Sequence, residues 1–438
     1  MSGAEPRAGR VLHILSQRPS LTGSGVTLDA TVRLAAAAGW DQRVVVAVPA
    51  ADCQPEVGGL ATECIEPLVF ETEELDFPLP GMSDVMPYRS SVFAQLTTAQ
   101  LAAYRDNWRR HLTGVATVFR PEIIHAHHLW IVASLLKDIL PAVPVVNHCH
   151  ATGLRQMQLC PHLAAEVKQG ARRNERFLVL SREHARQLAA CLQVPAERIH
   201  VVGAGYREDL FHTGDAASEA RIGSGADPEQ SARSHNLLYI GKYSAAKGLP
   251  WLLDAFTQLQ AQTPQLRLHV AGTGAGEEAD TLRRRMSAMA PSVVLHGQVA
   301  QPELARLMRR CAVCVLPSFY EGVPLVLVEA LASGCRLVAT RLPGIEEQLA
   351  PSLGAFFDLV PLPRLAGVDT PVAEDLPTFV ADLARAMAVA LARPAITAHG
   401  PGWDSALSCT DALHRAVAPF TWASVFSRIE TVWKELRV

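Results

Sequence analysis

The sequence lacks several features that would assign it to a particular class of protein. Its formal net charge is −3 over 438 residues, so it has neither a basic excess for nucleic acid nor an acidic solvating tail. It has no uninterrupted apolar run long enough to span a bilayer and no secretory signal at its start. We therefore expect a cytoplasmic protein that binds no nucleic acid and has no transmembrane segment. Nothing in the sequence indicates an oligomeric state.

Cysteine is present but is not arranged in a framework. The nine cysteines are an odd number without regular spacing, which favours reduced, mostly buried thiols over disulfides. Cys311 and Cys314 form a single C-x-x-C within CAVCVLPS, a segment typical of a buried strand. Residues three apart in a strand point to opposite faces, and no second C-x-x-C completes a zinc site. We expect neither a metal site nor a redox site at this pair.

The length and composition favour two globular domains. A chain of 438 residues is too long for one hydrophobic core, and its 49% hydrophobic content allows a large buried interior. Residues 1–9 are expected to be a loose leader. Residues 10–205 with 420–438 are expected to form the N-terminal domain, and 206–419 the C-terminal domain. Residues 213–235, rich in Gly, Ser, Asp and Ala, indicate a linker or surface insertion near the boundary.

Both halves alternate strand-like and helix-like segments, as is typical of a parallel sheet. The first half begins with the strand VLHILSQ (11–17), a turn at 22–25 and a helix that ends near Gly39. The second half restarts the alternation with the strand NLLYIGKY (236–243). The pattern predicts an α/β protein with two Rossmann-like, doubly wound sheets. Residues 71–92 break the alternation, and we expect them to form a long excursion from the first sheet.

The C-terminal segment predicts an amphipathic helix. Seven apolar side chains recur at helical spacing: Trp422, Val425, Phe426, Ile429, Val432, Trp433 and Leu436. A stripe with two tryptophans has to pack against a large surface. We expect this helix to cross back to the first domain.

Two lysines and two glutamates in the second half form the candidate site. GKYSAAKG (241–248) carries Lys242 and Lys247 after a strand, although two lysines five residues apart also suit a solvated surface. FYEGVPLVLVEALASG (319–334) places Glu321 in a turn and Glu329 on the helix that follows.

This helix is expected to begin near Pro324, a favoured first helical residue. A helix N-terminus at the carboxyl edge of a parallel sheet binds anions, since unpaired N–H groups and the helix dipole point outward. Gly322 lets the backbone approach closely. Because proline has no N–H, the donors would come from Val323, Leu325 and Val326.

The two glutamates require a different part of the ligand, because carboxylates repel phosphate. Vicinal hydroxyls of a sugar or a ribose suit them. The alternative is that Glu329 faces solvent and that Glu321 merely ends a turn.

These motifs resemble those of retaining GT-B glycosyltransferases, specifically glycosyltransferase family 4. Glu321 and Glu329 are similar to the family's E-x7-E motif. G-K-x-S-x-x-K-G, A-G-T-G (271–274), H-G-Q-V (296–299) and P-S-F-Y-E-G-V-P follow in the family's order. The first half resembles the family more weakly, through T-G-S-G-V (22–26), E-I-I-H-A-H-H (122–128) and V-V-N-H-C-H (145–150). The resemblance implies two domains facing a central cleft.

The resemblance also implies roles on the donor side. Lys242 and Lys247 would bind the donor diphosphate, with Lys242 standing where many relatives have arginine. Glu329 would bind the ribose hydroxyls of the nucleotide. Glu321 would hold the transferred sugar near its C3 and C4 hydroxyls.

Further roles follow from the same resemblance. Gly297 and Gln298 would meet the base, and Gly25 would close on the phosphate from the other domain. His150 matches the family's histidine near the anomeric carbon. The implied reaction retains anomeric configuration by front-face attack and needs neither a protein nucleophile nor a metal or other cofactor. A nucleotide-sugar, with UDP favoured, would donate a hexosyl group to a small-molecule or glycan acceptor.

Histidines near two strand ends raise the question of a metal site. They are His125, His127, His128, His148, His150 and His162. H-A-H-H offers two imidazoles on one strand face. No Asp, Glu or Cys stands at ligand spacing, so we expect most of these rings to line a cleft or to pack in the core.

The acceptor and some rival functions stay open. Residues 71–92 and the ATGLRQ stretch after His150 are the expected acceptor lining, where Arg89 and Arg155 suit an anionic acceptor or a plain surface equally. The alternatives are a hydrolysing nucleotide-sugar epimerase, a phosphorylase-like enzyme and a catalytically dead GT-B protein that only binds nucleotide-sugar.

Overall fold

A computed structural model describes residues 8–19, 22–83, 86, 88–150, 152–214, 233–393, 396 and 409–437. Most of the expected leader and most of the expected linker lie outside these residues. The chain divides into two compact units, Met1–Gly205 with Trp422–Val438 and Tyr206–Thr421, and each is described by itself.

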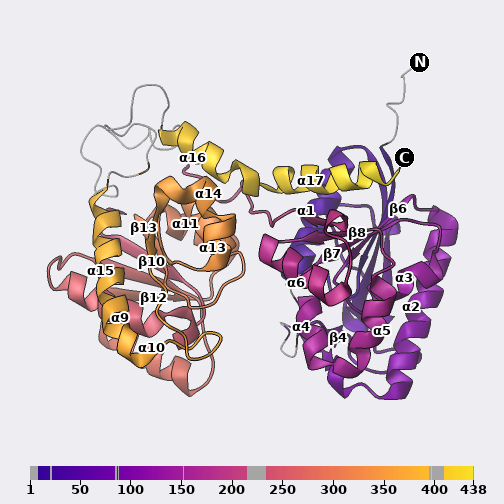
Figure 1. Cartoon of the computed structure of the whole chain (residues 1–438), viewed down its shortest axis with the longest axis horizontal. Helices are drawn as coiled ribbons and strands as arrows, with labels where there is room; N and C mark the ends of the chain where they lie inside the picture. Colours follow the sequence, from indigo (N-terminus) through magenta and orange to yellow (C-terminus); the bar gives the residue numbers. More distant parts are fainter. Residues whose placement is uncertain are drawn as a thin grey trace. The chain divides into compact units, whose positions relative to one another are not determined.

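The first unit is built on a parallel seven-stranded sheet in the order β3-β2-β1-β6-β7-β8-β9 (Figure 1). Its strands are β1 (Gly9–Leu15), β2 (Trp40–Pro49), β3 (Ile65–Phe70), β6 (Ile123–His127), β7 (Val145–Cys149), β8 (Arg176–Val179) and β9 (Ile199–Val201). Its helices are α1 (Gly23–Ala37), α2 (Thr98–Phe119), α3 (Ile131–Ile139), α4 (Thr152–Leu159), α5 (Pro161–Ala171), α6 (Arg182–Leu192) and α17 (Trp422–Glu435). Strands β6 and β7 are buried along their whole length, as expected for a sheet with helices on both faces.

The excursion at 71–92 is tied to the first unit rather than free of it. Its short strands β4 (Pro80–Gly81) and β5 (Ser91–Val92) pair with each other. Phe77 and Leu79 are buried in the core beside Tyr104 of α2. These apolar contacts hold part of the excursion against the sheet.

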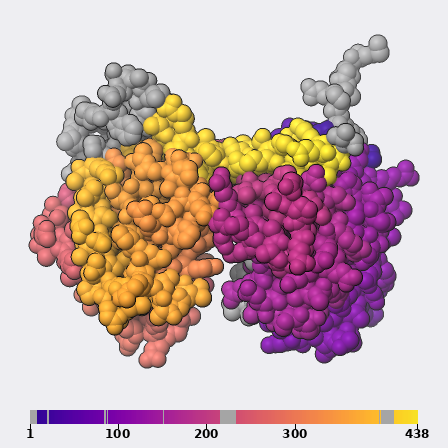
Figure 2. Space-filling model, in the orientation of Figure 1, coloured from indigo at the N-terminus to yellow at the C-terminus, as the bar shows by residue number. Residues whose placement is uncertain are grey.

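Helix α17 packs on the first unit, which confirms the predicted return of the chain. Figure 2 shows this segment, in yellow, lying along the surface of the first unit. Ile429 and Trp433 are fully buried in a cluster with Val11 of β1. The indole of Trp40 donates to Glu430 at 3.0 Å.

The second unit is built on a parallel six-stranded sheet in the order β12-β11-β10-β13-β14-β15. Its strands are β10 (Asn236–Ile240), β11 (Arg267–Ala271), β12 (Val293–Gly297), β13 (Val313–Leu316), β14 (Arg336–Thr340) and β15 (Phe357–Val360). Its helices are α9 (Leu249–Gln260), α10 (Glu277–Ala288), α11 (Gln301–Arg309), α12 (Leu325–Ala332), α13 (Pro343–Gln348), α14 (Ala350–Leu353), α15 (Leu376–Ala392) and α16 (Cys409–Val417). Both sheets have the predicted doubly wound topology.

Two sequence features can be placed in this fold. Cys311 and Cys314 are buried free thiols, and burial raises the pKa of each well above its usual value. Among the helices described, none combines the length and apolar character that crossing a membrane requires.

Candidate active site

In the second unit, the predicted lysines and glutamates gather where the strand order reverses. β10 and β13 are neighbours, and the chain winds outward from them in both directions. Lys242 and Lys247 follow β10, and Glu321 follows β13. Ligands of open α/β sheets bind outside the carboxyl ends of the strands at such a switch point.

Backbone contacts hold the two loops together. The Phe319 N–H donates to the Ala246 carbonyl at 3.0 Å. Gly248 adopts φ +71°, and a Cβ at this position would overlap the Pro317 carbonyl. Only glycine combines that conformation with so close an approach. The position of the Lys247 loop therefore depends on the glycine that follows it.

Lys247 and Glu321 form an ion pair. Lys247 Nζ lies 2.7 Å from Glu321 Oε1, and 28% of the lysine and 16% of the glutamate side chain is exposed. Lys242 is exposed and has no ion-pair partner within the described part of the chain. Its carbonyl accepts from the Tyr239 hydroxyl at 2.7 Å. The structure therefore brings together one predicted phosphate ligand and the predicted sugar ligand.

The helix after Glu321 begins next to Pro324, in agreement with the predicted start near this residue. Pro324 is in extended conformation, with φ −77° and ψ 90°, and α12 begins at Leu325. The Pro324 carbonyl accepts from the Leu327 N–H at 3.1 Å, so the N–H groups of Leu325 and Val326 are those at the open end of the helix.

Two glycines lie close together at this turn. Gly322 is exposed, and a Cβ there would meet no protein atom within 4 Å. A Cβ at Gly344 would overlap the Gly322 carbonyl. The contact between these two backbone segments therefore requires glycine at position 344, which lies outside the predicted motif.

Glu329 lies on α12 and is half-buried. Burial raises its pKa to about 7, because a charged carboxylate loses hydration in the interior. It is therefore not a freely solvated surface glutamate. Gly297, at the end of β12, has φ +65° and accepts from the Gly272 N–H at 2.7 Å, and Gln298 beside it is exposed.

The predicted residues of the first unit lie on several of its elements, and Gly25 is the one that follows a strand of the switch point between β1 and β6. The Gly25 N–H, in the first turn of α1, donates to Thr22 Oγ1 at 3.2 Å. His150 directly follows β7 and is 8% exposed. Arg155 is exposed on α4. Arg89 is 81% exposed and pairs with Glu71 at 3.1 Å, as a surface arginine does.

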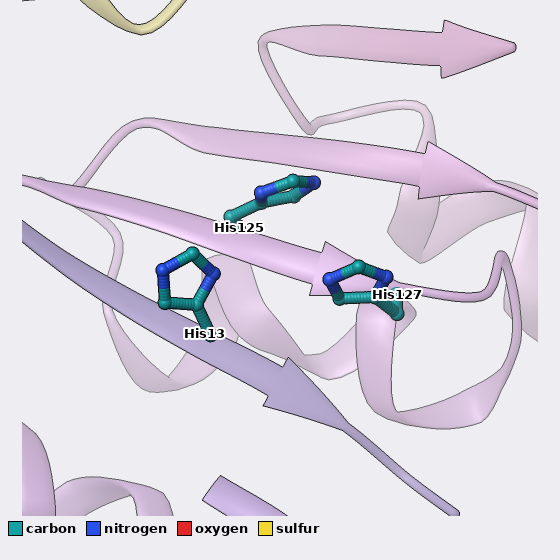
Figure 3. A group of neighbouring side chains, drawn as sticks. All are labelled: His13, His125 and His127. Carbon is teal, nitrogen blue, oxygen red and sulfur yellow. The ribbon is translucent and has the colours of Figure 1, made fainter. Parts of the chain in front are cut away.

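Five histidines form a layer on one face of this sheet, here called the histidine ladder. Its members are His13, His125, His127, His148 and His150. In the sheet register His13 lies opposite His125, and His127 lies opposite His148. Figure 3 shows the first three rings on β1 and β6. Ring centroids of neighbours in the ladder are 4.7–5.6 Å apart.

The histidines predicted to lie together are not the same set as those of the ladder. His162 is exposed on α5, so its expected place at the strand ends is wrong. His13 was missed, although its position within a strand-like apolar run was a signal for a buried ring. His128 directly follows β6, and its Nδ1 lies 3.1 Å from Thr152 Oγ1.

Two family models match the chain, one in each unit. The model described as glycosyl transferases group 1 matches residues 234–358. The model described as glycosyl transferase 4-like domain matches residues 22–205.

Curated relatives are bacterial. The chain is 30% identical over 315 residues to a D-inositol 3-phosphate glycosyltransferase of Arthrobacter sp. strain FB24, covering 68% of this chain and 71% of the relative. It is 26% identical to the enzyme of that name from Segniliparus rotundus, covering 58% of each. It is 28% identical to a glycogen synthase of Mycobacterium tuberculosis, covering 56% of this chain and 58% of the relative. The matches to the last two thus span less than two thirds of the relatives' length.

Solved structures share the fold over nearly the whole chain. A sucrose-phosphate synthase from Thermosynechococcus elongatus superposes with a TM-score of 0.61 at 18% identity, covering 98% of this chain and 99% of that one. The Anabaena protein HepE in complex with UDP-glucose gives 0.56 at 15% identity, covering 98% and 100%. At these identities the likeness concerns the fold, which is GT-B.

Proposed function

Because the chain belongs to the glycosyl transferases of group 1, we propose that it moves a sugar from a nucleotide-sugar to an acceptor with retention of anomeric configuration. The main support for this proposal is the ion pair between Lys247 and Glu321 at the switch point of the second sheet, with Nζ 2.7 Å from Oε1. A cation for the diphosphate and a carboxylate for the sugar are there side by side.

The donor contacts follow from the chemistry of each group. Lys242, Lys247 and the open N–H groups of α12 supply positive charge for the diphosphate. Glu321 neutralises Lys247 in the structure. A bound diphosphate would take over the lysine and leave the carboxylate to accept from the sugar hydroxyls. Glu329, one helical turn from Leu325, would accept from the ribose hydroxyls.

The remaining proposed contacts concern the base of the nucleotide. Gln298 is exposed beside Gly297, where it is available to a base. The donor we propose is a UDP-sugar. HepE, which shares the fold, is seen with UDP-glucose, and this makes UDP-glucose the first probe.

Two residues of the first unit complete the proposed machinery. Burial and neighbouring histidines hold the pKa of His150 well below its usual value, so the ring is neutral at pH 7 and can donate or accept a hydrogen bond. We assign it to the sugar near the reacting carbon. The turn at Gly25 would contribute to phosphate binding through backbone groups, although the Gly25 N–H is already bonded to Thr22.

The leaving diphosphate needs positive charge from a divalent ion or from the protein. We propose the protein, because two lysines and a helix N-terminus lie at one sheet edge. Turnover should therefore persist in excess EDTA. Loss of turnover in EDTA that magnesium or manganese restores, in a protein that circular dichroism shows to be folded throughout, would overturn this mechanism.

The acceptor site is proposed on the first unit, near residues 71–92 and α4. Arg89 and Arg155 are exposed there and would suit an anionic acceptor. Replacing both by alanine should raise the KM for an anionic acceptor and leave that for the donor unchanged.

The decisive experiment measures release of nucleotide from UDP-glucose and a panel of other nucleotide-sugars, with and without acceptors. Release that depends on an acceptor supports transfer. Release from the donor alone supports hydrolysis or epimerisation, and binding without release supports a dead fold. The anomeric configuration of the product, measured by NMR, tests retention.

A further inference from the structure

The histidine ladder places polar rings where the rest of the sheet face is apolar. His13, His125 and His148 have no exposed surface, and His127 is 3% exposed. Val11 and Ile123, one step earlier on the same face, lie in an ordinary apolar core with Trp433 of α17. The ladder thus replaces the apolar column toward the carboxyl ends of β1, β6 and β7.

These rings are short of hydrogen-bond partners. Nδ1 of His13, both ring nitrogens of His125 and Nε2 of His127 are buried without a partner among the described residues. A buried polar group without a hydrogen-bond partner destabilises the folded state, and native structures rarely leave several such groups together. A ligand that accepts the lone pairs of these nitrogens would supply the partners that they lack.

A glutamine sets the orientation of the first ring. Nε2 of Gln42 donates to the Val32 carbonyl at 3.0 Å, so the Gln42 side-chain oxygen faces His13. His13 Nε2 lies 3.0 Å from that oxygen and therefore carries the proton. The lone pair of His13 is then on Nδ1, the nitrogen that has no partner.

A similar contact orients His127. Its Nδ1 lies 3.3 Å from His150 Nε2. When His127 donates in this bond, its own lone pair is on Nε2, which again has no partner. Such outer hydrogen bonds hold the rings of metal-binding histidines in position.

We propose that His13, His125 and His127 bind one divalent transition-metal ion of the zinc type. One ring nitrogen from each of the three lies within 4.8 Å of the others. Nitrogens bound to zinc at about 2.0–2.1 Å lie about 3.3–3.5 Å apart. The rings of Figure 3 therefore need to close by up to about 1.5 Å, which small side-chain rotations provide.

The donor set selects the class of metal. Three imidazoles without a carboxylate suit zinc, cobalt, nickel or copper and do not suit magnesium, calcium or manganese. Imidazole binds such metals through the lone pair of its neutral form, and His13 presents that lone pair on Nδ1, as argued above.

The ion would be enclosed by the C-terminal helix. The Trp433 ring lies 5.6 Å from His13 and 5.3 Å from His125, centroid to centroid. A metal held beneath it would link β1 to β6 under α17. Its role is structural, and it is joined to the proposed transfer machinery only through the contact between His127 and His150.

The test uses the full chain without a polyhistidine tag, stripped with a chelator and dialysed. Zinc sulfate is titrated by calorimetry, and cobalt chloride by visible absorption. We expect one equivalent of zinc, the absorption bands of four-coordinate cobalt, and a melting temperature that rises with the logarithm of free zinc. No saturable binding, or an equal thermal shift with magnesium, would overturn the proposal.

Variants locate the ion. His13→Gln and His125→Gln should each weaken zinc binding at least tenfold, while circular dichroism checks that they fold. His184→Gln is the matched control, because His184 is also buried, and neither of its ring nitrogens has a partner in the described part of the chain. It belongs to neither triad of the ladder. A second triad, His127 with His148 and His150, also has nitrogens within 4.8 Å. Loss of binding in His148→Gln but not in His13→Gln would place the ion there and contradict our assignment.

Discussion

Residues from separate parts of the sequence neutralise each other in the second unit. Lys247 and Glu321 are half-buried, so their mutual attraction is screened less than that of a surface pair. This contact holds both side chains in place. Under the function proposed above, donor binding exchanges it for contacts with phosphate and sugar.

This exchange gives a prediction for the two residues. Glu321→Ala should reduce transfer by at least 100-fold and leave UDP affinity unchanged or tighter, since Lys247 loses its competitor. Lys247→Ala should weaken UDP binding about 10- to 100-fold, because a charge-assisted hydrogen bond contributes about 1.5–3 kcal/mol. Calorimetry with UDP and an assay of transfer measure the two effects. Equal losses of UDP affinity in both variants would show that the roles are misassigned, and Lys168→Ala on α5 is the control.

A second prediction concerns the protonation of Glu329. Its pKa of about 7 means that a proton has to leave before the carboxylate accepts from ribose. UDP affinity should therefore rise about tenfold between pH 6 and pH 8.

Glu329→Gln is the control for this effect. The diphosphate itself titrates in both proteins, so the difference between their pH profiles isolates Glu329. Identical pH profiles of UDP affinity in the unaltered protein and in Glu329→Gln would show that Glu329 does not bind the nucleotide.

At the scale of elements, α17 completes the first unit from the far end of the chain. Its apolar stripe lies on the sheet beside α1 and is part of one buried cluster. Arg437, just after the helix, pairs with Glu122 at 2.8 Å. Packing contributes most of the stability here, because exposed ion pairs contribute little.

Trp433→Ala should therefore destabilise the first unit by about 3–5 kcal/mol, as expected for a large buried aromatic side chain. Arg437→Ala should cost less than about 1 kcal/mol. Urea unfolding, followed by circular dichroism, measures both. A Trp433 effect as small as that of Arg437 would mean that α17 is dispensable for the fold.

At the scale of the whole molecule, the buried histidines make folding depend on pH. Burial lowers the pKa of His13 and His184 to about 4 and that of His148 to about 3. In the unfolded chain these rings titrate near 6.5. Below pH 6.5 the unfolded state thus binds more protons than the native state, and stability falls as pH falls.

We expect each such histidine to remove about 1.4 kcal/mol per pH unit between roughly pH 6 and the native pKa. Urea midpoints at pH 7.5, 6 and 5, measured in chelator, should fall steeply. His148→Gln should weaken the dependence of the unfolding free energy on pH by the contribution of one titrating histidine. A midpoint independent of pH would contradict burial of neutral rings.

Much of the architecture could be predicted from local pattern. Alternating apolar strands and amphipathic helices indicated two doubly wound sheets, and the stripe around Ile429 indicated a helix that packs on a core. Such signals are local, because period and composition decide which element forms. The predicted start of α12 near Pro324 also agrees with the observed start at Leu325.

The sequence could not determine the contacts that depend on strand order and register. Lys247 meets Glu321 only because β10 and β13 are neighbours, and Gly344 reaches Gly322 only through the fold of the second unit. The ladder combines His13 with His125 because β1 lies beside β6 in register. By itself, then, the sequence determined which elements form and which motif they carry. The tertiary structure decided which distant side chains touch, because strand pairing is set by packing of the whole sheet rather than by spacing along the chain.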